Sequence, residues 1–120
     1  MISPQTPEIW LVRFPFSDLT STKLRPAFIL AAHREELIIL GIFSKMPIGE
    51  LRETWVVISD KHPNFSQTGL KKTSLIRTDK IATVNASVFQ RQLGSLPSDI
   101  LPLVQAALKI CLNISYILLV

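Results

Sequence analysis

The chain has 120 residues, 48% of them hydrophobic, and carries a formal net charge of +4 at pH 7. This length predicts one domain over residues 1–120, and the apolar content excludes an intrinsically disordered chain. A single cysteine, Cys111, excludes an intrachain disulfide and fits a reducing cytoplasm, while two histidines, His33 and His62, without clustered carboxylates argue against a metal site.

The N-terminal third is predicted to form two strands joined by a long polar loop. Its first ten residues lack the cationic start and the apolar run of a secretory signal. Residues 9–14 and 27–32 are apolar, aromatic or β-branched except for Arg13, which predicts strands buried on at least one face. The connection between them, residues 15–24, is long for a hairpin, and loops of this length often carry function.

Arg25 stands where this loop meets the second strand. Pro26 fixes its own φ angle and pushes Arg25 toward an extended backbone, which holds the arginine at the mouth of the strand. Such a position suits a group that binds a phosphate, and it equally suits a surface arginine that begins an edge strand. These two residues alone leave both alternatives open.

The middle of the chain continues with short strands. They are predicted at residues 37–43, 55–59, 74–84 and 92–95, with an interruption allowed in the third of these and one helical turn allowed at residues 85–90. Trp10 and Trp55 are expected in the core rather than at a subunit interface. Many short strands followed by one helix indicate a mainly β (α+β) protein with a small, strongly curved sheet.

Residues 100–120 form the last predicted element. They are mostly apolar, and their length approaches that of a membrane span. Polar residues nevertheless recur at every fourth position: Gln105, Lys109 and Asn113. This stripe favours an amphipathic helix that packs against the sheet, and possible burial by a second subunit, over a membrane helix. Ser98 or Asp99 is expected to cap its N-terminus.

Basic residues gather in one part of the chain, between residues 61 and 91, where Asp79 is the only acid. They are Lys61, Lys71, Lys72, Arg77, Lys80 and Arg91. A polyanion or an acidic protein is the natural partner for such a segment, and basicity alone does not choose between them.

Three motifs follow one another along the chain. The first is EIWLVRF, a polar loop and RPAFIL, residues 8–30; the second is IILGIFSK, residues 38–45, with a hydroxyl at Ser44; the third is GLKKTSLIRTDKIATV, residues 69–84. In this order they resemble the MazF/PemK family, the ribonuclease toxins of bacterial type II toxin–antitoxin pairs, over roughly residues 8–112. Ser44 stands where that family usually has threonine.

This resemblance implies an SH3-like curved β-barrel of the CcdB/Kid/MazF plasmid-toxin type with a C-terminal helix, assembled as a homodimer. It further implies a cytoplasmic, metal-independent and sequence-specific endoribonuclease that cleaves single-stranded mRNA through attack of the ribose 2′-hydroxyl on the adjacent phosphate. No cofactor and no membrane partner are expected. The expected protein partner is a MazE-like antitoxin whose acidic segment occupies the basic groove.

The same resemblance suggests roles for individual residues. Arg25 would stabilise the charge of the phosphorane, because its planar fork can bind two phosphate oxygens, and Ser44 would donate a hydrogen bond to the same phosphate. Asp79 is either the base or the group that orients an arginine, and its place on the strand face of Arg77 favours the orienting role. Contacts to RNA are expected from Lys23, Lys45, Arg77, Lys80 and, through base stacking, Phe16.

A second hypothesis keeps the fold without the chemistry. The protein would then be a binding toxin, either a CcdB-like gyrase poison or a degenerate toxin that only binds its antitoxin. The ribonuclease is preferred because a pure binder has no need of Arg25, Ser44, Arg77 and Asp79 together. The loop at residues 15–24 lacks the histidine that some family members carry, which leaves proton transfer to Asp79 or Arg25.

Overall fold

The structure of the protein is a computed structural model that describes residues 3–13 and 23–114. Within these residues the chain forms six strands, two short 3-10 turns and one α-helix. Their order is β1 (Glu8–Arg13), β2 (Leu24–His33), β3 (Glu36–Phe43), β4 (Trp55–Ile58), η1 (Phe65–Thr68), β5 (Ser74–Asn85), η2 (Ala86–Val88), β6 (Phe89–Ser95) and α1 (Leu101–Leu112).

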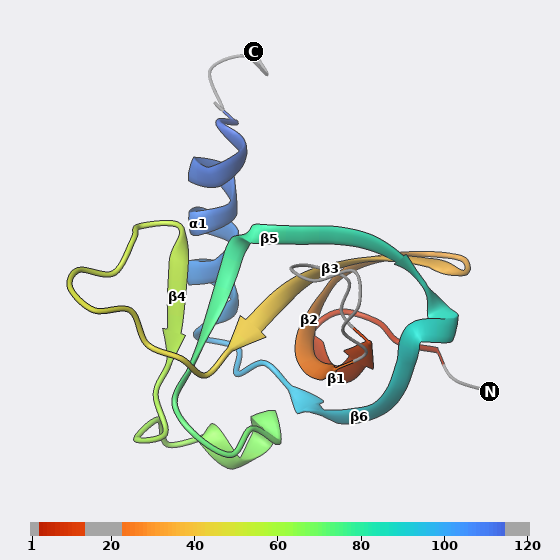
Figure 1. The fold of residues 1–120 in the computed structure, drawn as a ribbon, viewed down its shortest axis with the longest axis horizontal. Coiled ribbons are helices and arrows are strands. Elements are labelled where there is room, and N and C mark those ends of the chain that lie inside the picture. Colours follow the sequence, from red (N-terminus) through yellow and green to blue (C-terminus); the bar gives the residue numbers. More distant parts are fainter. Residues whose placement is uncertain (1–2, 14–22, 115–120) are drawn as a thin grey trace.

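The strands form one antiparallel sheet in the order β4-β5-β3-β2-β1-β6. The sheet curls so strongly that β5, η2 and β6 pass around β1 and β2, while α1 stands beside β4 and β5 (Figure 1). The predicted mainly β fold, with a small, strongly curved sheet followed by one C-terminal helix, is confirmed.

Neighbouring residues of the central strands pack into two different hydrophobic cores. In β2, Ala27 and Ile29 belong to an inner core, whereas Phe28 belongs to an outer core that also contains Val104 and Ala107 of α1. Both faces of β2 are therefore covered, which explains the unbroken apolar run of this strand. Trp10 packs in the inner core as expected, in an edge-to-face contact with Phe89 at 5.9 Å between ring centroids.

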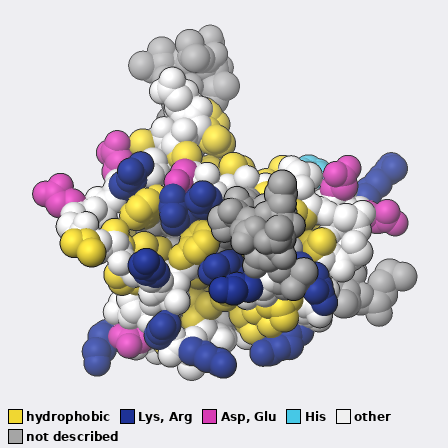
Figure 2. All heavy atoms as spheres, viewed as in Figure 1, with side chains coloured by type: hydrophobic (Ala, Val, Ile, Leu, Met, Phe, Trp, Pro, Cys, Tyr) yellow, Lys and Arg dark blue, Asp and Glu magenta, His cyan; other side chains and the backbone are white. Residues whose placement is uncertain are grey.

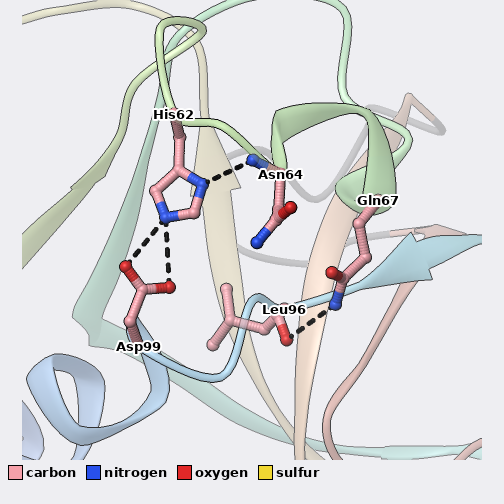
Figure 3. Close-up of polar contacts among 5 residues, drawn as sticks. All are labelled: His62, Asn64, Gln67, Leu96 and Asp99. Carbon is pink, nitrogen blue, oxygen red and sulfur yellow. Dashed lines mark hydrogen bonds and ion pairs between the residues drawn. The ribbon is translucent and has the colours of Figure 1, made fainter.

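The helix α1 begins later than predicted and has a different N-terminus. Ile100 is the N-cap residue and no side chain caps the helix, so the prediction of a cap at Ser98 or Asp99 is wrong. Asp99 instead accepts hydrogen bonds from the ring of His62, which lies 37 residues earlier in the chain (Figure 3). The helix ends at Leu112, followed by Asn113 in the left-handed region at φ 57°.

Not all of α1 is covered by the sheet. Four apolar side chains of this segment are exposed: Leu103, Ile110, Leu112 and Ile114. Cys111 on this helix is half-buried. No helix among the described residues has the length and hydrophobicity needed to cross a membrane, and residues 115–120 of the predicted helix lie outside the described part of the chain.

A bulge interrupts the pairing of β5 without ending the strand. Leu40 of β3 pairs with Ile81, whereas the next residue, Gly41, pairs with Arg77, so residues 78–80 have no partner on β3. The buried Thr78 secures this bulge, because its backbone N–H and its hydroxyl both donate to the carbonyl of Thr54. The bulge determines where the side chains of Arg77 and Asp79 are placed.

Candidate active site

A cavity of about 430 Å³ opens over four neighbouring strands. Its floor follows the register of the sheet, because Arg91 of β6 pairs with Leu11 of β1, which pairs with Pro26 of β2. Ile42 of β3 continues this apolar floor. The sheet order therefore brings together side chains that are far apart in the sequence.

Arg25 and Ser44 both line this cavity. Arg25 is the second residue of β2 and is half-buried, while Ser44 follows the last residue of β3 and is exposed. The structure thus places the two residues with predicted phosphate contacts at one cavity. Among the described residues, no carboxylate forms an ion pair with Arg25.

The opposite wall of the cavity is the segment from Gly69 to Ser74, which carries Lys71 and Lys72. With Arg25 and Arg91 these lysines give four cationic side chains around the cavity, and none of the described residues that line it is acidic. Such a cavity attracts an anion before any specific contact is made. Lysine and arginine side chains surround exposed hydrophobic side chains on the face shown in Figure 2, where most acidic side chains lie near the outline.

Two glycines hold this wall against β6. A Cβ atom on Gly69 would lie 2.0 Å from the carbonyl oxygen of Leu93, and one on Gly94 would lie 2.1 Å from the carbonyl oxygen of Gln67. Gly69 also has a φ of 72°, a conformation that side chains disfavour. The two backbones therefore approach more closely than any other residue allows, and this contact fixes the lysine wall beside the cavity floor.

Polar contacts connect residues 62–67, which precede Gly69, to residues 95–99 before the start of α1 (Figure 3). The Nε2 atom of His62 lies 2.9 Å and 3.0 Å from the two carboxylate oxygens of Asp99, and its Nδ1 accepts the backbone N–H of Asn64. The side-chain amide of Gln67 donates to the hydroxyl of Ser95 and to the carbonyl of Leu96. These contacts connect η1 and the loop before it to the segment that links β6 and α1.

A second cavity of about 400 Å³ is lined by Phe43, Trp55 and Arg77, and Phe43 contacts Arg25 of the first cavity. The guanidinium carbon of Arg25 lies 5.7 Å from the ring centroid of Phe43, and that of Arg77 lies 5.6 Å from the same ring. Arg77 also lies 4.5 Å from the ring of Trp55, whose ring is 5.4 Å from Arg52. Cation–π attraction therefore links Arg25 to Arg77 through one shared ring.

Arg77 is held in addition by Asp79. Its Nη2 donates to Asp79 Oδ2 at 2.6 Å and its Nε to Oδ1 at 3.2 Å, while the indole N–H of Trp55 donates to Oδ1 at 2.9 Å. Hydrogen bonding from Arg77 lowers the pKa of Asp79 below its ordinary value; partial burial opposes this and the bond from Trp55 adds to it. Asp79 is therefore a weak base whose oxygens are already occupied.

The remaining predicted contact residues have separate positions. Lys45 lines the second cavity together with Arg77. Lys80 lies in the bulge of β5 and lines neither cavity, and Lys23 is exposed immediately before β2. Phe16 lies outside the described residues, as does most of the loop that was expected to contribute to RNA binding.

Sequence reasoning missed part of this arrangement. Trp55, expected in the core, is half-buried and contacts both Arg77 and Asp79, and Phe43 was considered only as part of a strand. Lys71, Lys72 and Arg91 were noted for their charge, without a place in the site. The basic span between residues 61 and 91 was the available signal, but only the sheet register shows which of its members face Arg25.

Comparison with known proteins identifies the family. The family model described as PemK-like, MazF-like toxin of type II toxin-antitoxin system matches residues 6–112. Similar solved structures include the Mycobacterium tuberculosis toxin MazF-mt6, with 18% identity, a TM-score of 0.72 and coverage of 91% of this chain and 99% of that one. An endoribonuclease in complex with its cognate antitoxin, from Mycobacterial species, has 15% identity, a TM-score of 0.72 and coverage of 95% and 99%.

The chain of a MazE-MazF crystal structure from Deinococcus radiodurans has 16% identity, a TM-score of 0.69 and coverage of 96% and 100%. No curated protein matches the sequence. At these identities the structural likeness shows the fold alone, and it confirms the MazF-like fold that the motifs implied. The family model covers most of the chain, and the protein therefore belongs to the PemK-like, MazF-like toxins of type II toxin–antitoxin systems.

Proposed function

We propose that this toxin is a metal-independent endoribonuclease that cleaves single-stranded mRNA at specific sequences. The observation that carries the proposal is the cavity in which Arg25, free of any carboxylate partner among the described residues, faces the same space as the hydroxyl of Ser44. Four cationic side chains line this space, so a phosphodiester fits it better than a neutral ligand does. Similar solved structures carry the name endoribonuclease.

The proposed reaction needs no metal ion and no cofactor. The ribose 2′-oxygen attacks the adjacent phosphorus while its proton passes to water, the bond from phosphorus to the 5′-oxygen breaks, and this oxygen takes up a proton from water. The products are a 2′,3′-cyclic phosphate and a 5′-hydroxyl. Arg25 binds two oxygens of the pentavalent phosphorane through its planar fork, and Ser44 donates a hydrogen bond to a phosphate oxygen.

Asp79 acts in this proposal as a positioning residue. Its carboxylate accepts hydrogen bonds from Arg77 and Trp55, and it lines neither cavity. By fixing Arg77 against Phe43, it also fixes one side of the ring on which Arg25 rests. Two donors of Arg77 are used by Asp79, so its contact to RNA is made through the remaining edge of the guanidinium.

The direct test is cleavage of a long single-stranded RNA by the purified protein in EDTA. We expect cleavage by the wild type, at least 100-fold less by Arg25→Ala, and unchanged cleavage by Arg13→Ala, which removes an exposed arginine that lines neither cavity. Absence of cleavage by the wild type would refute the enzymatic function and favour a binding toxin. Cleavage that EDTA abolishes would refute the metal-independent mechanism.

The proposed setting is a cytoplasmic homodimer that is neutralised by a MazE-like antitoxin. Homologous structures were solved with their antitoxins, and an acidic antitoxin segment would complement the cations of the cavity. The exposed Leu103 and Ile110 of α1 support a second subunit on this helix. We expect a mass of twice 13.5 kDa by light scattering, reduced to one subunit by Ile110→Glu and unchanged by Gln105→Glu.

A further inference from the structure

The cavity holds more positive charge than one phosphodiester can use. A phosphodiester carries a single negative charge, and in the proposed function Arg25 and Ser44 already bind it. Lys71, Lys72 and Arg91 nevertheless line the same cavity. Like charges around one small space repel one another unless further anions are bound between them. The excess of three cations therefore indicates that the natural ligand brings additional negative charge into this cavity.

The floor of the cavity adds a second requirement. Between the cations lie apolar side chains from four strands and from the wall: Leu11, Leu24, Pro26, Ile42, Leu70 and Leu93. Free inorganic phosphate has no apolar part that could use such a surface. A nucleotide unit of a single strand does, because its ribose and unstacked base present apolar faces beside the charged backbone.

We propose that Lys71, Lys72 and Arg91 form a subsite for the RNA backbone next to the scissile phosphate, with the intervening nucleoside on the apolar floor. This inference rests on the proposed function and extends it to residues that neither the motifs nor the family comparison assigns. RNA is favoured over an acidic peptide because the subsite is continuous with Arg25 and Ser44 in one cavity, as consecutive phosphates are continuous in one strand.

The placement of the two lysines depends on the contact between the wall and β6. Lys71 and Lys72 follow Gly69, whose backbone meets that of Leu93 at a distance that excludes a side chain. Arg91 lies two residues before Leu93 on the same strand. The contact therefore joins the backbone segments that carry the two halves of the proposed subsite.

The test measures RNA binding as a function of salt. The probe is a fluorescein-labelled single-stranded RNA of mixed sequence with 2′-O-methyl groups throughout, which removes the attacking hydroxyl and prevents cleavage. For single strands, each neutralised phosphate contributes about 0.7 to the slope of log K against log salt concentration. We expect the Lys71→Gln, Lys72→Gln, Arg91→Gln triple variant to lower this slope by about 2, and each single variant to lower it by about 0.7.

The matched control is Arg34→Asn, which removes an exposed cation at the far end of β2 and suits the left-handed backbone at φ 60°. Its slope should equal that of the wild type. A triple variant with the wild-type slope would overturn the proposal, as would one that keeps RNA binding and loses affinity for poly-glutamate. Cleavage of unmodified RNA by the wild type is measured in parallel. If the wild type cleaves this RNA, the proposed function stands even when the subsite is refuted.

Discussion

Replacing Gly69 by alanine should loosen the wall of the cavity and destabilise the fold. A Cβ atom there would meet the carbonyl oxygen of Leu93 at 2.0 Å, whereas ordinary contact begins at 3.4 Å, so the backbones must separate by more than 1 Å. Overpacking of this kind costs about 1–3 kcal/mol. The left-handed φ of 72° adds about 1–2 kcal/mol for a residue with a side chain.

The Gly49→Ala variant separates these two effects. Gly49 also has a positive φ, 101°, but a Cβ atom there meets nothing within 4 Å, so only the backbone cost applies. Urea denaturation should therefore show Gly69→Ala to be less stable than Gly49→Ala by about 1–3 kcal/mol, or roughly 4–12 °C in melting temperature. Equal stability of the two variants would refute the close approach of the wall to β6. If Gly69→Ala binds RNA as tightly as the wild type, the close approach is not important for RNA binding.

Other substitutions test single groups of the site and of the fold. Ser44→Ala should lower the cleavage rate by about 10-fold to 100-fold, the value of one hydrogen bond to a charged group, without changing the melting temperature; an unchanged rate in a gel-based time course would remove Ser44 from the site. Arg25→Lys keeps the charge but not the fork, so its kcat/KM should fall between those of the wild type and Arg25→Ala, and full activity would contradict bidentate binding. The pKa of Asp79 is lowered in the folded state, so its contribution to stability is present above the ordinary pKa of 3.8 and is lost as the pH falls through the folded-state pKa. Asp79→Asn should accordingly show a smaller drop in melting temperature between pH 5 and pH 3 than the wild type. It should slow cleavage but keep both the acidic and the alkaline limb of the pH–rate profile. Loss of the acidic limb would identify Asp79 as the base. Hydrogen bonding to His62 likewise lowers the pKa of Asp99. Asp99→Asn should therefore show a smaller drop in melting temperature at acidic pH and should cleave RNA at pH 7 as fast as the wild type. If the melting temperature of this variant depends on pH as that of the wild type does, the contact contributes nothing to stability.

Local pattern was sufficient to predict that the strands and the helix exist, although the helix ends at Leu112, earlier than predicted. The apolar run around Phe28 predicted a buried strand, and the polar stripe on α1 predicted a helix that packs against the sheet. Both interpretations agree with the structure. The outcome differed where a distant partner decides the local structure. Asp99 has the side chain of a helix cap, yet it binds His62 from a loop earlier in the chain, and no local pattern reveals that competition.

The site was predictable only in part for the same reason. Arg25 and Ser44 were predicted from motifs and line one cavity, and the pairing of Arg77 with Asp79 follows from their spacing on one strand. The contact of Trp55 with Asp79 depends on the register of β4 against β5 and on a bulge at residues 78–80, neither of which has a clear sequence signature. Lys71 and Arg91 line the same cavity because two glycines, Gly69 and Gly94, allow their backbone segments to approach closely.

The mass of the RNA fragments produced in EDTA tests most directly whether this site cleaves RNA by attack of the 2′-hydroxyl. The wild type should release fragments that end in a 2′,3′-cyclic phosphate and begin with a 5′-hydroxyl, and Arg25→Ala should release far fewer of them. Fragments that begin with a 5′-phosphate would show that water attacks the phosphorus and would contradict the mechanism. Intact RNA after prolonged incubation with the folded wild type would contradict the enzymatic function itself.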